Sequence, residues 1–176
     1  ESGRMRGFQL WVNLPARDKM TDPKYQEFAP ESIPVATPAP GVTVKVIAGA
    51  VGNVIGPIAQ PATDPVYLDV GLEAGASWQY LLPEGHNAFA YVFEGAVTLG
   101  LGDEARALEA QEMAVLGGGD LLQLRAGSRD ARLIVVAGKP LREPIVQYGP
   151  FVMNTQEQIF QALRDMQSGR LVQQAG

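Results

Sequence analysis

The chain has 176 residues, a mass of 18.8 kDa and a formal net charge of −5, and this length suits one domain of ordinary size. It has no cysteine, which excludes disulfides, thiolate zinc ligands and thiol nucleophiles, and one histidine cannot supply a two- or three-histidine metal site. The acidic balance argues against direct nucleic-acid binding, and no apolar run approaches the roughly 20 residues of a membrane span. We therefore expect no nucleic-acid or membrane partner, and a cytoplasmic location.

The N-terminal part is expected to contain one strand and a long connector. Residues 7–14 alternate Phe8, Leu10 and Val12 with less apolar residues, which is typical of a half-buried strand. Residues 15–40 are polar and rich in proline, which predicts a linker. The first residue is not methionine, so we expect a processed chain or a fragment of a longer one.

Short apolar segments recur about every 8 to 12 residues from Gly41 onward, with glycine-rich or Asp/Asn-containing joints between them. No helical period interrupts this region, so a parallel βαβ sheet is disfavoured and an all-β sandwich or barrel is predicted. The predicted strands are Val42–Ala48, Val66–Val70, Ser77–Leu82, Ala88–Phe93, Ala96–Leu101, Glu112–Leu116, Leu121–Arg125 and Ala131–Ala137.

One amphipathic helix is predicted at Thr155–Gln167, with Asn154 as its N-cap and Glu157 three residues further on, as in a capping box. A single short helix is marginal in water, so its apolar stripe should dock on the barrel, on an absent domain or on another chain. The expected stripe consists of Ile159, Phe160, Leu163 and Met166.

Three separated motifs carry a resemblance to a known family. Gly85–Gly95 (GHNAFAYVFEG) resembles the central hairpin of a cupin, and Gly7–Pro15 (GFQLWVNLP) and Gly149–Thr155 (GPFVMNT) resemble segments of pirins. Pirins contain two cupin domains. The resemblance implies a cupin double-stranded β-helix barrel, jelly-roll-like, with one C-terminal helix, and a bacterial source. It further implies four parts: the last strand of an N-terminal cupin (1–14), a linker (15–40), the C-terminal cupin (41–151), and a helix with a tail (152–176).

The same resemblance bears on metal binding. Pirins hold a metal, usually iron, in the N-terminal barrel through three histidines and one glutamate. Counted from the cupin motifs, the corresponding positions in this chain are degenerate and hold Leu82, Glu84, Ala88 and Asp130. We therefore expect no metal, cofactor or catalytic residue in this chain, and iron or another divalent metal in a full-length protein. The alternative, a hard cation held weakly by the two carboxylates, is disfavoured.

Four further side chains are candidates for contacts at the mouth of the barrel or with a partner. His86 has no identifiable partner that would orient it as a general base, so we expect it to stabilise its loop by side-chain to backbone hydrogen bonds. Arg125, Arg129 and Arg132 surround one hairpin and are suited to bind an anion or an acidic partner. Local ion pairing with Asp120 and Asp130 is the favoured interpretation of these arginines.

Three functions remain open at this point. The first is a metal-free, structural or partner-binding C-terminal cupin of a pirin-like protein, whose partner is the N-terminal cupin domain and, beyond it, a further protein. The second is a part of a complete metal-dependent dioxygenase resembling quercetin 2,3-dioxygenase, whose iron ligands lie upstream of Glu1. The third is a stand-alone homodimeric module, in which segment 7–14 adds to the barrel of a second copy.

Overall fold

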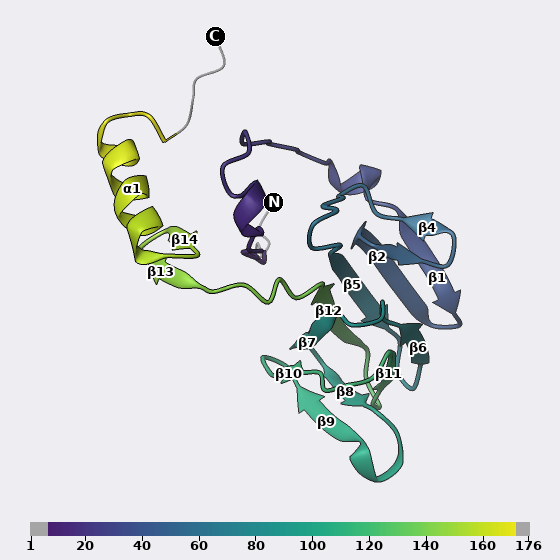
Figure 1. Cartoon of the computed structure of the whole chain (residues 1–176). Coiled ribbons are helices and arrows are strands. Elements are labelled where there is room, and N and C mark those ends of the chain that lie inside the picture. The colour runs from purple at the N-terminus through teal and green to yellow at the C-terminus, as the bar shows by residue number, and fades with distance from the viewer. Residues whose placement is uncertain (1–6, 172–176) are drawn as a thin grey trace. The chain divides into compact units, whose positions relative to one another are not determined.

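The computed structural model of the chain describes residues 7–171 and divides into two compact units (Figure 1). The first, which we call the barrel unit, is Gln26–Pro140, and the second, the terminal unit, combines the residues up to Tyr25 with those from Leu141 onward. The unit boundaries therefore lie at 25/26 and 140/141, whereas the sequence predicted boundaries at 40/41 and 151/152.

The barrel unit consists of two main antiparallel sheets. The six-stranded sheet has the order β1-β2-β5-β12-β7-β10, and the four-stranded sheet has the order β6-β11-β8-β9. The strands of the first sheet are β1 (Val35–Ala39), β2 (Val42–Ala48), β5 (Val66–Leu72), β12 (Ala131–Gly138), β7 (Asn87–Glu94) and β10 (Met113–Val115). Those of the second are β6 (Ser77–Leu81), β11 (Leu121–Ala126), β8 (Ala96–Leu99) and β9 (Arg106–Glu109). All the predicted strands from Val42 onward form, so the predicted all-β fold is confirmed.

The core of the barrel unit is a single apolar cluster to which both main sheets contribute. Alternation along β5 buries every second residue, as expected for a strand with one face on a core. Leu68, Leu124 and Leu133 are among the largest side chains that are completely buried, and they come from β5, β11 and β12. The space between the sheets is thus filled by aliphatic side chains, and its burial stabilises the unit.

The N-terminal part differs in two respects from the strand and linker that the sequence led us to expect. Residues 7–15 form no strand, because a strand needs a hydrogen-bonded neighbour and none of the described sheets includes these residues. The expected linker, 15–40, contains β1 together with two 3-10 turns, Ala16–Asp18 and Pro30–Ser32. The sequence did not predict β1 because Pro38 lies within it. Proline is tolerated in a strand at a sheet edge, which is where β1 lies.

The terminal unit contains the hairpin of β13 (Val146–Tyr148) and β14 (Phe151–Met153) and the helix α1 (Gln156–Gln167). Ile159 and Ala162 are the buried residues of α1, and they pack with Phe151 of the hairpin. The helix therefore docks on this hairpin, whose residues up to Phe151 the sequence assigned to the barrel.

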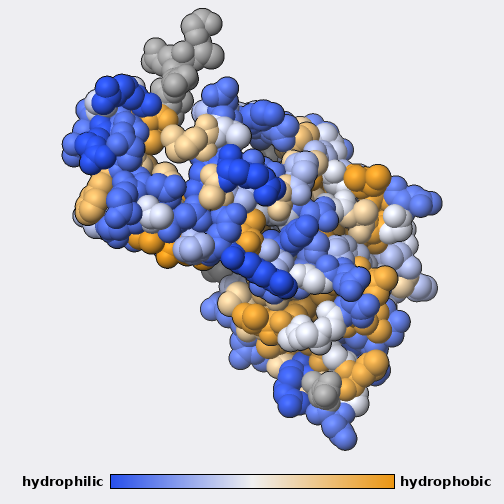
Figure 2. Space-filling model, viewed as in Figure 1, coloured by the Kyte–Doolittle hydropathy of each residue, from blue (hydrophilic) through white to orange (hydrophobic). Residues whose placement is uncertain are grey.

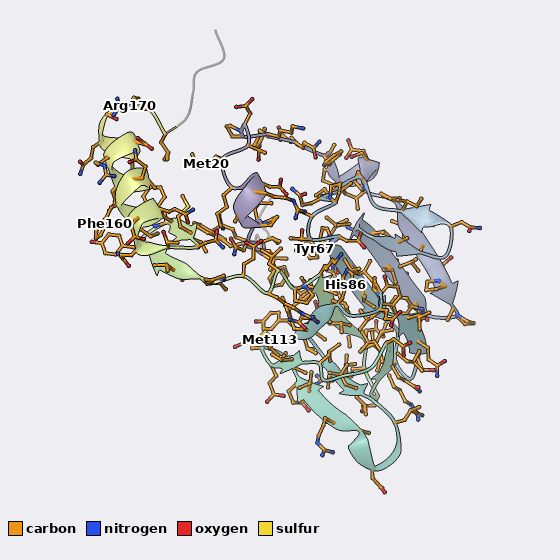
Figure 3. The ribbon with its side chains drawn as sticks, viewed as in Figure 1. Met20, Tyr67, His86, Met113, Phe160 and Arg170 are labelled. Atoms are coloured by element: carbon orange, nitrogen blue, oxygen red, sulfur yellow. The ribbon has the colours of Figure 1, made fainter. Side chains whose placement is uncertain are left out.

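The details of the α1 prediction also need correction. Thr155, and not Asn154, is the N-cap, and its capping-box partner is Gln158 instead of Glu157. Phe160 and Met166, which were expected in the buried stripe, are 52% and 48% exposed, and Figure 3 shows the Phe160 ring projecting from the helix. Of the expected stripe, Ile159 is buried in the cluster with Phe151 and Leu163 packs against it, so only part of the stripe is covered.

The tight turn between β7 and β8 depends on Gly95. Its φ of +72° lies in the left-handed region, where residues with a side chain are strained. A Cβ atom at this position would overlap the carbonyl oxygen of Asp130 and lie 2.9 Å from Cα of Ala131. The Glu94-Gly95 turn, which the sequence predicted from its turn-forming residues, is therefore also a point of close backbone approach.

Candidate functional site

A cavity of about 850 Å³ opens on the barrel unit, and we call it the mouth cavity. Its walls come from three segments: the small hairpin of β3 (Ala50–Val51) and β4 (Val54–Ile55), the loop at 56–66, and the residues from Tyr80 to Glu84 at the end of β6. Apolar side chains predominate among the lining residues, which are Gly49, Ala50, Ile55, Gly56, Ile58, Ala59, Gln60, Pro61, Asp64, Pro65, Val66, Tyr80, Leu81, Leu82, Pro83, Glu84 and Asp120.

Hydrogen bonds to the sheets hold the first wall in place. The hydroxyl of Tyr80 donates to the carbonyl oxygen of Ala50 at 3.0 Å, which fixes β3 against β6. The Tyr80 ring is buried, lies 5.2 Å from the ring of Trp78, and has its pKa raised by this burial. The phenol is therefore neutral over the whole physiological range and acts as a hydrogen-bond donor within the wall.

The loop wall is fixed by close contact with β2. The amide of Gly56 donates to the carbonyl oxygen of Gly49 at 2.9 Å, and that of Ile58 donates to Ile47 at 3.2 Å. Only glycine fits at position 56, because a Cβ atom there would lie 2.7 Å from backbone atoms of Ile47 and Ala48. The backbone of this loop is thus pressed onto the sheet, and the wall exists before any ligand binds.

His86 joins the loop wall to the turn that follows β6. Its Nε2 atom lies 2.9 Å from the carbonyl oxygen of Asp64, and its Nδ1 atom lies 3.4 Å from that of Glu84. The side chain is only 5% exposed, and Nε2 is also 3.6 Å from the Asp64 carboxylate. Both ring nitrogens thus face backbone carbonyl oxygens, as the sequence predicted. A neutral imidazole donates to only one of them, and that of Asp64 is the nearer. The contacts give His86 a positioning role at the cavity (Figure 3).

The charged side chains that line the mouth cavity all carry the same sign. Asp64, Glu84 and Asp120 come from three different segments, and no lysine or arginine of the described residues lines the cavity. The Asp64 side chain is 70% exposed, and the residues at 84 and 120 are also exposed. The carboxylates therefore form an acidic rim around an apolar interior.

Two of the four positions that the cupin resemblance assigned to metal ligands hold apolar side chains. Leu82 and Ala88 are each 6% exposed and belong to the apolar core, so they offer no ligand atom. Glu84 lies just before Asn87, the first residue of β7. Asp130 lies just before β12, and the start of β12 pairs with Glu94, the last residue of β7. The two ends of β7 are roughly 23 Å apart at strand rise. The structure therefore does not bring the two carboxylates together, and no cluster of metal-ligating residues was found among residues 7–171.

The role of Asp130 is structural. Its Oδ1 atom accepts a hydrogen bond of 2.9 Å from the backbone amide of Ala74, which links two loops at the far end of the barrel unit. Asp130 also lines a smaller hollow of about 260 Å³, with Glu73, Glu94 and Arg132. This carboxylate is thus engaged at the end of the barrel opposite to the mouth cavity.

The three arginines do not act as one cluster. Arg132 forms an ion pair with Asp69, in which its Nη2 atom donates to both carboxylate oxygens, at 2.8 and 3.1 Å, and its guanidinium lies 5.0 Å from the centre of the Phe93 ring. Arg125 and Arg129 are exposed. The expected pairing with Asp120 and Asp130 was wrong, since among the described ion pairs only Arg132 is engaged, and its partner is on a neighbouring strand.

Sequence reasoning missed Tyr80, Asp64 and Gly56 as parts of the cavity. Alternation along Ser77–Leu81 indicated that Tyr80 points to the core face, but nothing local identified Ala50 as its acceptor. The loop at 56–66 carries no periodic pattern, so the sequence did not predict its path along β2. No helix of the described chain has the length and hydrophobicity needed to cross a bilayer.

Comparison with known proteins gives a consistent result. The model of the pirin C-terminal cupin domain matches residues 67–172. A pirin-like protein of Caulobacter vibrioides is 47% identical over 171 residues, which are 97% of this chain and 60% of that protein. Pirin of Mus musculus is 42% identical over 165 residues, with 93% and 56% covered. The crystal structure of a quercetin 2,3-dioxygenase from Acinetobacter baumannii has a TM-score of 0.82 and 36% identity, with 92% and 55% covered. The chain thus spans little more than half the length of these relatives.

Proposed function

Because this chain belongs to the pirin family, we propose that its barrel unit is the metal-free structural cupin of a pirin-like protein and performs no catalysis by itself. The observation that carries this proposal is the chemistry of the inferred ligand positions. Two of them, Leu82 and Ala88, are occupied by core hydrocarbon, and the two carboxylates, Glu84 and Asp130, lie at opposite ends of the barrel. Such a barrel has no donor set around which a divalent metal would bind.

In a longer protein, the role of the barrel unit would be to support a second domain that carries the chemistry. The relative from Acinetobacter baumannii is described as a quercetin 2,3-dioxygenase, and this chain covers 55% of it. Any such activity would require iron or another divalent metal held by residues outside this chain. We therefore assign no dioxygenase step to the residues described here.

The terminal unit supplies the surface for that support. Phe8 and Val12 alternate with less apolar neighbours as in a half-buried strand, yet they are 37% and 56% exposed, and the adjacent Trp11 is 71% exposed. We propose that segment 7–14 becomes a strand when the edge of an N-terminal cupin domain is available to it. The other candidate for this edge is a second copy of the chain.

Metal analysis tests the barrel proposal. After treatment with a chelator, the chain is incubated with Fe²⁺, Mn²⁺ or Zn²⁺, desalted and analysed for bound metal, and its thermal unfolding is followed in parallel. We expect no stoichiometric metal and no stabilisation. The variant carrying Glu84→Gln and Asp130→Asn should behave like the parent. Stoichiometric metal that this variant loses would overturn the proposal.

Removal of residues 1–14 tests the role assigned to the terminal segment. If the segment joins a second copy, the solution mass of the intact chain exceeds that of a monomer, and the truncated chain is monomeric. If it joins an N-terminal cupin domain, the intact chain is monomeric and binds that domain added in trans, whereas the truncated chain does not. An unchanged mass together with unchanged binding would refute both assignments.

A further inference from the structure

The mouth cavity has the features of a preformed small-molecule site. Its volume of about 850 Å³ lies within the range of roughly 300–1,000 Å³ that is usual for ligand pockets. Its walls are fixed by the Tyr80 hydroxyl, by the contact of Gly56 with β2, and by the His86 bridge. Figure 2 shows hydrophobic side chains gathered in separate patches over the barrel unit, with hydrophilic residues between them.

The interior of the cavity favours an apolar body. Ile55 and Leu81 line it while being 72% and 67% exposed, and Ile58 adds a side chain that is 37% exposed. Side chains of this type gain about 25 cal/mol for each Å² that a ligand removes from water. A ligand that covers these three residues would therefore bind through hydrocarbon or aromatic groups.

The rim decides the charge of the ligand. Among the described residues, the carboxylates of Glu84 and Asp120 form no hydrogen bond or ion pair, and that of Asp64 faces only the buried His86, at 3.6 Å. The ring nitrogens of His86 already lie near two carbonyl oxygens, so this side chain belongs to the wall and does not reach into the cavity lining. The field inside the cavity is therefore negative, and it attracts cations and repels anions.

We propose that the mouth cavity binds a small organic cation, an ammonium group carried on an aromatic or alkyl body. The body packs against the side chains of Ile55, Ile58 and Leu81, and the ammonium group lies at the rim between the three carboxylates. Two of the degenerate metal positions line the site: Leu82 adds apolar surface, and Glu84 contributes charge and not coordination. It is independent of the structural role proposed for the barrel unit.

Three probes of matched shape test the proposal: the cation of 2-phenylethylamine, the neutral 2-phenylethanol and the anion phenylacetate. Affinities are measured by NMR titration of the full isotope-labelled chain, which also locates the shifted amides. We expect the cation to bind about tenfold tighter than the alcohol and the anion to bind least, with shifts at residues 49–66 and 80–84. Equal affinities for the cation and the alcohol would overturn the proposal, as would the absence of cation binding.

Two triple variants with the same net charge separate the rim from the general charge of the chain. Asp64→Asn, Glu84→Gln and Asp120→Asn together should reduce cation binding about tenfold, to the level of the alcohol. Asparagine is well tolerated at position 64, whose φ of 41° lies in the left-handed region. The control variant carries Glu31→Gln, Asp103→Asn and Glu109→Gln, which are exposed and lie outside the cavity.

The control triple should bind the cation as the parent does, and both variants should keep the thermal unfolding of the parent. Equal losses in the two triples would show a general charge effect and would refute the site. A further variant, Ile58→Ser, tests the apolar part, because it should weaken the cation and the alcohol by the same factor. If Ile58→Ser leaves the affinity for the cation unchanged, the proposed contact between Ile58 and the apolar body of the ligand is contradicted.

Discussion

The substitution Gly95→Ala provides a quantitative test of how the turn between β7 and β8 is packed. A left-handed conformation costs an alanine about 1–2 kcal/mol relative to glycine, and the stiffer unfolded chain returns about 0.4–1 kcal/mol. At Gly95 the new Cβ also overlaps the carbonyl oxygen of Asp130, and this backbone has to shift. Overpacking of this kind costs a further 1–3 kcal/mol or so. We expect a total loss of about 2–4 kcal/mol in the free energy of unfolding.

Gly75 is the matched control, because its φ is +74° and nothing lies within 4 Å of a Cβ atom at this position. Gly75→Ala therefore carries the conformational cost alone, and its expected loss is about 1 kcal/mol or less. The difference between the two variants measures the cost of the close approach at Gly95.

Urea unfolding followed by tryptophan fluorescence is the appropriate assay. Trp78 is buried in the core of the barrel unit, whereas Trp11 is 71% exposed in the terminal unit. The measurement is therefore made in a Trp11→Phe background, so that the signal reports on the barrel unit only. If both substitutions lower the free energy of unfolding equally, and the slope of this free energy against urea concentration is unchanged, the close approach described for this turn would be refuted.

Three further predictions concern the helix, the core and the alkaline limit of stability. Thr155→Ala should cost about 1 kcal/mol and speed amide exchange in the first turn of α1, because it removes the capping box; unchanged exchange would contradict this role. Leu124→Ala should destabilise the barrel unit by about 2–5 kcal/mol in urea unfolding, whereas Leu121→Ala, at a site 53% exposed, should cost less than about 1 kcal/mol. Burial raises the pKa of Tyr80 in the folded state, so stability is full below the ordinary tyrosine pKa near 10 and falls as pH rises through the raised value. Tyr80→Phe should reduce this alkaline loss without abolishing it, because burial raises the pKa of Tyr67 as well; an unchanged pH profile would count against the burial of the Tyr80 phenol.

The strands of the barrel were predictable where local physical signals agree. Between Val42 and Ala137 the side chains alternate and the joints contain glycine or aspartate, so period and turn chemistry point to the same boundaries. The strand β1 was missed because Pro38 and its polar neighbours resemble a linker, and only the presence of β2 beside it makes pairing possible. Strand β9 was missed for a similar reason, since its four residues show no clear alternation.

The helix illustrates a different limit. Its position was predicted within one residue, because capping residues and an apolar stripe both mark it. Both Asn154 and Thr155 are good N-caps, and the choice depends on Gln158, whose side chain accepts from the backbone amides at 154 and 155. Phe160 is 52% exposed because it lies outside the cluster that α1 forms with the hairpin, and no local pattern encodes which residues that cluster takes up.

The candidate site was the least predictable part. His86 was correctly expected to contact its own loop, because its neighbours in the sequence offered no catalytic partner. Its second contact, with Asp64, joins residues 22 positions apart, and the cavity exists only because these segments meet. The acidic rim likewise combines side chains from three segments, none of which is unusual in the sequence by itself.

The terminal unit is built from both ends of the chain, so its two parts become available for folding at different times during synthesis. The backbone amide of Ala16 donates to the Glu143 carboxylate at 2.7 Å, across a separation of 127 residues. At about 5–20 residues per second, a ribosome needs roughly 6–25 s to deliver the second half of this pair. The barrel unit, Gln26–Pro140, is complete by then, so the N-terminal segment has to wait without its partner while the exposed ring of Trp11 remains accessible to chaperones.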